Sequence, residues 1–276
     1  MLAEDKKIDV EEQIIAYCKS HIGSQDIKHP LYPVRLGAYE LFKAQGLPTT
    51  RNEQWRYTNI VSKLEKIPSQ SLSKPVPVNL DNFINNFEIV KKAKENNDSV
   101  LVFMDGAMQS QLSVVNSDTK TISVTSLKRD PIPDWAIKLN SKKHSQNMDE
   151  LFNLNTTLME DGAIINISNN KAVADTIYII HVGNNDGFYN YRHMINVQNG
   201  AHVNIFEFKI SNKTDIEALY TSSIIWKIGD NCVVNNVKYQ AHNQVTIGFN
   251  QQYADIDNNT EFNSFTISSG SKLLRE

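Results

Sequence analysis

The sequence has very little cysteine. Cys18 and Cys232 are the only two among 276 residues, and they form no C-x-x-C pair. A disulfide framework is therefore not expected in a reducing cytosol. Neither thiol has the basic neighbours that would activate it, so we expect both side chains to be small buried hydrophobes.

Long hydrophobic runs are absent as well. No stretch approaches the roughly 18 apolar residues of a membrane-spanning helix, and residues 1–7 lack the apolar core of a signal peptide. We therefore expect the protein to stay in the cytoplasm, where it is made. The formal net charge of −3 gives no electrostatic reason to bind nucleic acid or an anionic membrane.

Three families of catalytic motif are missing. The chain contains no G-x-x-x-x-G-K-S/T loop and no G-x-G-x-x-G after a strand, which excludes a Walker-type ATPase and a dinucleotide-binding site of the usual kind. It also contains no G-x-S-x-G elbow of a serine hydrolase. The apolar fraction of 40% nevertheless indicates a folded protein with a substantial core.

The first third of the chain has helical periodicity. Apolar residues recur at helical spacing over residues 10–22, with Gly23 as a C-terminal stop, and a second pattern covers residues 34–42 before Gly46 and Pro48. We therefore predict an N-terminal helical region over residues 1–68. Serines and two prolines between Ser69 and Pro77 predict a linker and connecting segment over residues 69–98.

The remainder, residues 99–276, predicts a β-rich core. An apolar run over residues 99–104 stops at Asp105-Gly106, as a buried strand would. From about residue 163, short β-rich runs alternate with turns rich in Asn, Asp and Gly. The predicted strands cover residues 163–167, 176–182, 191–197, 202–208, 222–228, 233–239, 244–249 and 261–267.

Four of the turns resemble one another: Asp161-Gly162, Asn199-Gly200, Asp230-Asn231 and Asn258-Asn259. They lie 38, 31 and 28 residues apart (161 to 199, 199 to 230, 230 to 258), which indicates a coil with two or three strands per repeat. Asparagine is abundant around them, and it tolerates positive φ and can stack in hydrogen-bonded ladders. The fold class we predict is mainly β, with N-terminal helices and a right-handed parallel β-helix-like solenoid.

Histidines and carboxylates are the candidate site residues. His181, His193 and His202 lie in three successive predicted strands, with His242 further on, but spacings of 12 and 9 residues match no common zinc signature. We expect these histidines to be polar ladder or surface residues, and we assign no metal, cofactor-binding or catalytic residue. The acidic candidates, which lie near predicted turns where Asp is favoured, are Asp161, Asp175, Asp186, Asp230 and Asp255.

Residues 51–59 mix charge with large rings, which is typical of a docking surface. The charged and aromatic members are Arg51, Glu53, Trp55, Arg56 and Tyr57. The alternative is that Trp55 and Tyr57 anchor the helical region to the β-core, and the two interpretations are compatible.

Two short sequence motifs resemble those of a known family. Residues 46–59 read GLPTTRNEQWRYTN, and residues 154–163 read LNTTLMEDGA. Together with Tyr178–Val182 and residues 192–207, they resemble the SufD branch of the SufB/SufD family in their order and spacing. The N-terminal block is more similar to SufD than to SufB.

The resemblance implies a non-catalytic scaffold component of iron–sulfur cluster assembly. It implies pairing with a SufB-like paralogue through the β-helix and cooperation with a SufC-like ATPase. Apart from the resemblance, a homodimer is a further partner prediction. Because a cluster usually takes four cysteine ligands, two cysteines predict that none is bound by this chain alone and that it is assembled on the complex. In the family the β-helix continues beyond the part matching residues 270–275 and a helical segment follows, so we expect an incomplete β-core without the SufC-docking region.

Other classes stay open from the residues alone. The main alternative is a β-helical carbohydrate-active lyase or hydrolase built on clustered acids. A β-solenoid adhesion module is a third interpretation, which the missing secretory signal disfavours.

Overall fold

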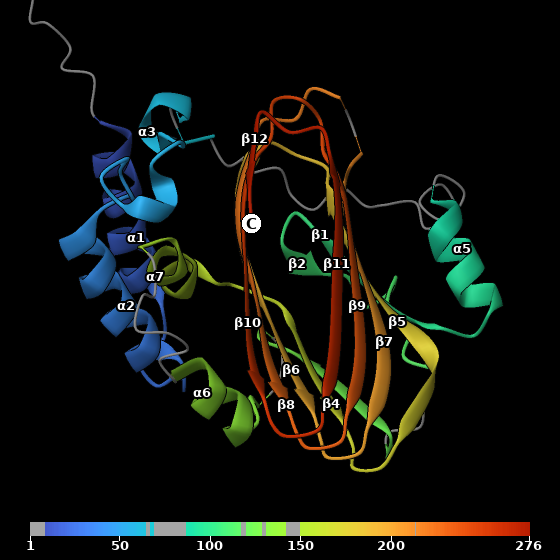
Figure 1. The fold of residues 1–276 in the computed structure, drawn as a ribbon. Coiled ribbons are helices and arrows are strands. Elements are labelled where there is room, and N and C mark those ends of the chain that lie inside the picture. Colours follow the sequence, from blue (N-terminus) through green and yellow to red (C-terminus); the bar gives the residue numbers. More distant parts are fainter. Residues whose placement is uncertain are drawn as a thin grey trace, which may run out of the picture.

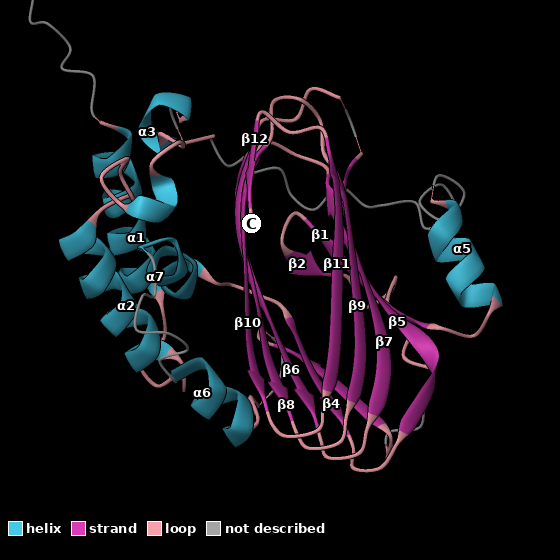
Figure 2. Cartoon of the chain, viewed as in Figure 1, coloured by secondary structure: helices cyan, strands magenta, loops and turns pink. Residues whose placement is uncertain are grey.

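The computed structural model describes residues 9–64, 67–68, 87–116, 120–128, 131–141, 150–212 and 214–276, without the side chains of residues 174 and 175. A layer of helices lies beside a tall, flattened coil of strands (Figure 1). Figure 2 shows the two kinds of structure segregated, with one further helix on the opposite side of the coil. The helices are α1 (Val10–Ser24), α2 (Tyr32–Gln45), α3 (Ile60–Lys63), α5 (Glu88–Glu95), α6 (Asp134–Ser141) and α7 (Glu150–Leu158), with a 3₁₀ turn at Glu53–Trp55.

The two N-terminal helices form where the periodicity predicts them. Asp9 caps α1 by accepting a hydrogen bond from the Glu11 backbone N–H. Pro33 lies in the first turn of α2, and Gly46 ends that helix with a positive φ of 74°. Helix α1 continues one residue past Gly23, the predicted stop, and ends at Ser24.

The strands wind into a parallel solenoid of about four turns, as predicted. Each turn contributes one strand to each of two sheets, in the orders β11-β9-β7-β5-β1-β2 (sheet A) and β12-β10-β8-β6-β4-β3 (sheet B). The strands are β1 (Ser99–Met104), β2 (Ala107–Met108), β3 (Ile122–Ser126), β4 (Ala163–Ile167), β5 (Ala172–Gly183), β6 (Gly187–Val197), β7 (His202–Ser211), β8 (Ala218–Ile228), β9 (Val233–Ala241), β10 (Ile247–Ile256), β11 (Glu261–Ser269) and β12 (Leu273–Arg275).

One corner residue per turn adopts a positive φ. Asn170, Gly200, Asn231 and Asn259 have φ between 52° and 70° and follow one another at 30, 31 and 28 residues. This spacing matches the ladder offsets, for example Val203 to Val234 and Val233 to Glu261. The repeat is therefore two strands, and the three-strand alternative is wrong.

Asparagine ladders join successive turns. Asn196 donates to Asn166 at 2.6 Å within sheet B. In sheet A, Asn235 donates to Asn204 at 2.9 Å and Asn263 donates to Asn235 at 3.0 Å. The prediction of stacked asparagines is confirmed.

The first turn of the solenoid is covered by antiparallel strands. β2 folds back on β1, and β3 pairs antiparallel with β4. The buried Asp161 carboxylate fastens both, because it accepts from the Ser126 hydroxyl at 2.5 Å and from the Met108 N–H at 2.8 Å. These strands remove edges that would otherwise be open to another chain.

Helices cover the outer face of sheet B. Cys18, Phe42 and Leu154, from α1, α2 and α7, pack in one cluster with Phe188 and Phe249 from the sheet. Helix α5 instead packs on sheet A and lies within the predicted linker, whose residues 69–86 are outside the described part. In the described residues, none of the helices has the length and apolar character needed to cross a membrane.

Candidate functional site

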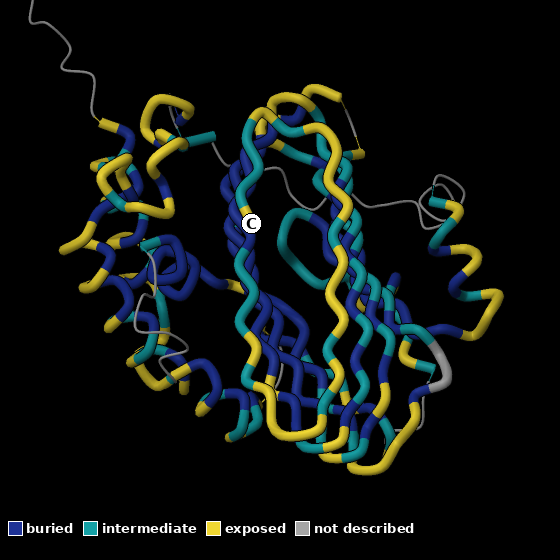
Figure 3. The backbone as a smooth tube through the Cα atoms, viewed as in Figure 1, coloured by how far each residue is buried: buried dark blue, intermediate teal, exposed yellow. Residues whose placement is uncertain are grey.

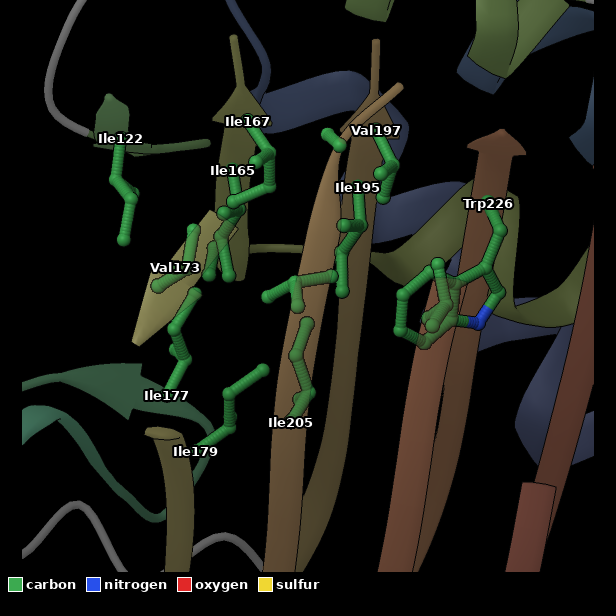
Figure 4. Packing of buried hydrophobic residues seen from close by; sticks show 14 of the residues in the cluster. Ile122, Ile165, Ile167, Val173, Ile177, Ile179, Ile195, Val197, Ile205 and Trp226 are labelled. Atoms are coloured by element: carbon green, nitrogen blue, oxygen red, sulfur yellow. The ribbon is translucent and has the colours of Figure 1, made fainter. Parts of the chain in front are cut away.

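The interior of the solenoid is divided lengthwise into an apolar and a polar half. The apolar half, near the corners that follow β4, β6 and β8, contains Ile165, Ile195, Ile205 and Trp226 (Figure 4). The polar half is formed by the inward-facing residues nearer the opposite corners. Its members include Tyr191, Tyr220, Ser222, Asn250, His181, His193, Glu207, Lys209 and Gln240, all buried.

A histidine pair joins the two sheets at the first turns. His181 on β5 and His193 on β6 are both buried, and their Nε2 atoms are 2.9 Å apart. The Ala163 backbone N–H donates to His193 Nδ1 at 2.9 Å. Neutral His193 therefore carries its hydrogen on Nε2 and donates it to His181 Nε2, so His181 is protonated on Nδ1, for which the described residues provide no acceptor.

Burial keeps this pair neutral. Desolvation lowers the pKa of His193 to about 4, and it lowers that of His181 well below its ordinary value, with His193 and Lys209 adding to the effect. Phe103 and Tyr191 both stack on His181, with their ring centroids 5.0 Å and 4.1 Å from that of the imidazole. The expectation that His181 and His193 are ladder or surface residues is wrong, because both point into the solenoid.

The other two candidate histidines behave differently. His202 is exposed at the start of β7, as a surface residue would be. His242 Nε2 lies 2.8 Å from the Tyr220 hydroxyl. The structure thus brings together two of the four histidines, and the sequence spacing did not identify which two.

An ion pair lies beside the histidines. Lys209 Nζ is 3.2 Å from Glu207 Oε1, and both side chains are almost fully buried. Burial alone would raise the pKa of Glu207, but Lys209, Lys238 and His193 together hold it below its ordinary value. Burial lowers the pKa of Lys209, which Glu207 opposes.

The hydrogen-bond partners of Lys209 bear on where the proton of this pair lies. Lys209 also contacts Ser222 Oγ at 2.8 Å and Asn250 Oδ1 at 2.7 Å. Ser222 in turn donates to Asn250 Oδ1, while the Asn250 amide donates to Gln240. Lys209 Nζ therefore lies within hydrogen-bond distance of three oxygens, one for each hydrogen of an ammonium, and its charge is among those that lower the pKa of Glu207; we assign Lys209 as an ammonium and Glu207 as a carboxylate on both grounds.

His181, His193 and Glu207 resemble a metal-ligand set, because one ligand-type atom from each lies within 4.8 Å of the others. A metal needs a lone pair on each ligand atom. The Nδ1 lone pair of His193 accepts the hydrogen bond from the Ala163 N–H, and Nε2, the atom that faces His181, carries a hydrogen. The arrangement is therefore built as a hydrogen-bonded pair, and that no metal is bound here stays a prediction.

The stretch at residues 154–163 clamps a buried arginine. Arg192 on β6 is 0% exposed and points outward beneath α7. It donates to Asn140 at 2.6 Å, Asn155 at 3.1 Å and Thr156 at 2.7 Å, and its guanidinium stacks on Phe152. With only neutral partners, burial lowers the pKa of Arg192 to about 9. This stretch therefore fixes α7 to β6 through the side chain of Arg192.

Residues 51–59 divide between two roles. Trp55 is buried and contacts Phe249 at 6.1 Å between ring centroids, and the Arg275 guanidinium lies 4.8 Å over its ring. Arg275 also donates to the Gln54 carbonyl. The anchoring interpretation is confirmed for Trp55 and wrong for Tyr57, which is 92% exposed beside Arg56.

The acidic candidates serve turns and ladders. Asp161 holds the covering strands, Asp186 accepts from the Glu217 N–H at 2.8 Å, and Asp230 accepts from the Asn258 N–H at 2.9 Å. Asp255 lies opposite Lys227 in the β8–β10 ladder. The Asp175 side chain is outside the described part. Both cysteines are buried, as predicted, and burial raises the pKa of the Cys18 thiol to about 12.

Two family models together match residues 13–276 of the chain. Residues 13–179 match the family model of the SufBD protein N-terminal region. Residues 179–276 match the SufBD core domain of the SUF system of FeS cluster assembly. A search of curated proteins finds no match to this chain.

Proposed function

The chain belongs to the SufB/SufD family of the SUF iron–sulfur cluster assembly system, and from this premise we propose that it is a SufD-type scaffold component without catalytic activity of its own. The family match carries the proposal. The assignment to the SufD branch rests on the N-terminal block, in which Trp55 anchors the helical layer to β10.

The chemistry of the described residues supports a scaffold. Several buried polar side chains of the interior bond to one another, and Lys209 has an oxygen within reach of each ammonium hydrogen. Cys18 and Cys232 are both buried, one in the helical layer and one at a solenoid corner. Such a chain would share the ligands of a cluster with its partner, the cluster being the product that the complex assembles.

The partners follow from the same proposal. We propose that the solenoid pairs with a SufB-like paralogue in the cytoplasm and that a SufC-like ATPase drives the assembly. The strands β11 and β12 and the part of the outer face of sheet A that α5 leaves uncovered are the surfaces that such pairing would use.

Co-expression tests the proposal. The tagged chain is expressed with the SufB-like and SufC-like proteins of the same genome, purified, and analysed by size-exclusion chromatography with mass determination. We expect the SufB-like protein to co-elute in a defined ratio. Elution of the chain by itself at every concentration, with the paralogue well folded in the same extract, would contradict the proposal.

A further inference from the structure

The outer face of sheet A carries apolar rows that cross the sheet from strand to strand. The parallel register aligns Val100, Tyr178, Phe206, Val237 and Phe265 in one row. The next row contains Val102, Ile180, Phe208, Tyr239 and Ile267. All ten point away from the solenoid interior, because their sequence neighbours at odd spacing face the core.

One end of each row is covered by a helix. Val100 and Val102 are fully buried and pack with Val90 and Ala93 of α5 and with Leu112. Helix α5 keeps its charged residues on its other side, where Lys92 pairs with Glu88 at 2.9 Å. The established occupant of this face is therefore a short amphipathic helix.

Exposure increases along the rows away from α5. Figure 3 shows β11 largely exposed while the strands of the earlier turns are more buried. Phe265 is 62% exposed and Ile267 is 45% exposed. The aromatic rings between them are in contact, with centroid distances of 5.7 Å for Tyr178–Phe206 and 5.8 Å for Phe208–Tyr239.

The apolar strip is thus half-buried on β7 and β9 and exposed on β11, and a contiguous apolar surface of this kind is typical of an interaction site. The polar part of the same face is sharply separated from it, because the next outward positions toward the corner are the laddered Asn204, Asn235 and Asn263. The apolar strip is thus bounded by α5 on one side and by the asparagine ladder along its length.

We propose that this strip, over β7, β9 and β11, binds an amphipathic helix of a partner protein, laid beside α5 with aliphatic or aromatic residues at i, i+3 and i+4. The occupant is inferred from continuity: the same two rows already bury the apolar face of α5 at their other end. The partner helix extends an interface that the fold has already built. This inference does not depend on the proposed role in cluster assembly.

The test uses a labelled, hydrocarbon-stapled helix with the sequence of residues 87–96 as the probe, because in the structure this helix packs its apolar face on the Val100 and Val102 end of the same two rows. Binding to the full chain is measured by fluorescence anisotropy. The Tyr239→Lys/Phe265→Lys variant removes the strip, and Asn235→Lys/Asn263→Lys is the matched control on the same strands and the same face. Far-UV circular dichroism and thermal melting verify that both variants fold. Phe265→Lys alone replaces the first variant if Tyr239→Lys unfolds the chain.

We expect saturable binding that weakens at least tenfold in the strip variant and less than twofold in the control. Absence of binding to the unmodified chain, or equal binding by both variants, would overturn the proposal. Sedimentation velocity tests the other occupant. A dimer that forms with increasing concentration and disappears in the strip variant would assign the strip to a second copy and would also overturn it.

Discussion

Replacing Lys209 by methionine tests the contribution of the buried Lys209–Glu207 ion pair to the stability of the solenoid. The substitution keeps most of the apolar stem but removes the ammonium that lies 3.2 Å from Glu207 Oε1. Glu207 Oε2 already lacks a hydrogen-bond partner in the described residues, so in the variant only Lys238 and His193 would oppose the desolvation of the buried carboxylate. Breaking a buried ion pair from one side costs about 3–5 kcal/mol.

The pH dependence gives this prediction its sign. In the unmodified chain Lys209 holds the pKa of Glu207 below its ordinary value, so this carboxylate stabilises the fold above that ordinary value and the stabilisation is lost as the pH falls. In Lys209→Met the folded-state pKa of Glu207 rises instead. Its cost is then full above the new pKa and shrinks by about 1.4 kcal/mol for each pH unit between the new pKa and the ordinary pKa of a glutamate.

Urea unfolding at about pH 8 and about pH 5 measures both effects. We expect a loss of about 3–5 kcal/mol at the higher pH, a smaller loss at the lower pH, and partial recovery at the higher pH in Lys209→Met/Glu207→Gln. An equal loss at both pH values, or no recovery in the double variant, would refute the assignment of an ionised pair.

Three further predictions follow from the helical clamp, the corner glycine and the histidine pair. Arg192→Lys should cost about 2 kcal/mol or more in chemical unfolding, because one ammonium cannot replace the guanidinium that joins Asn140, Asn155 and Thr156; a variant as stable as the parent would contradict the clamp. Gly162→Ala should prevent folding, because the added Cβ would lie 1.8 Å from the Arg192 carbonyl oxygen and the residue has a φ of 154°. The control Gly23→Ala, in α1, places its Cβ in open space and should fold normally. Soluble expression and circular dichroism compare the two variants. Folding favours the neutral form of His193 and lowers its pKa to about 4, so the stability that depends on this form is complete above about pH 6.5 and declines as the pH falls toward 4. Urea unfolding midpoints should therefore fall over that pH range, and the fall should be smaller in His193→Gln. Identical pH profiles of the two proteins would argue against a neutral pair.

The solenoid was predictable because residue types that favour turns recur at the corners between its strands. Asn231 and Asn259 occupy positions where a positive φ is required, so the repeat is visible as spacing. Strand lengths were less visible. β6 begins at Gly187, before the predicted start at 191, because Gly187 and Asn190, residue types that are depleted in strands, lie inside it.

The interior cluster was not predictable for a related reason. His181 and His193 are 12 residues apart and meet only because β5 and β6 face each other across the flattened coil. Which residues face inward depends on strand register, and one residue of slip reverses every side chain. The role of Asn155 and Thr156 was equally hidden, since their partner Arg192 lies about a turn of the solenoid later.

The most direct test of the scaffold account is anaerobic loading with ferrous iron and sulfide, followed by visible absorption and by iron content after desalting. The account predicts that the chain alone retains no cluster, while the complex with the SufB-like paralogue acquires one in proportion to the complex formed. A stable cluster on the chain alone, or a complex that never gains one while the paralogue alone does, would contradict the claim that cluster assembly is shared.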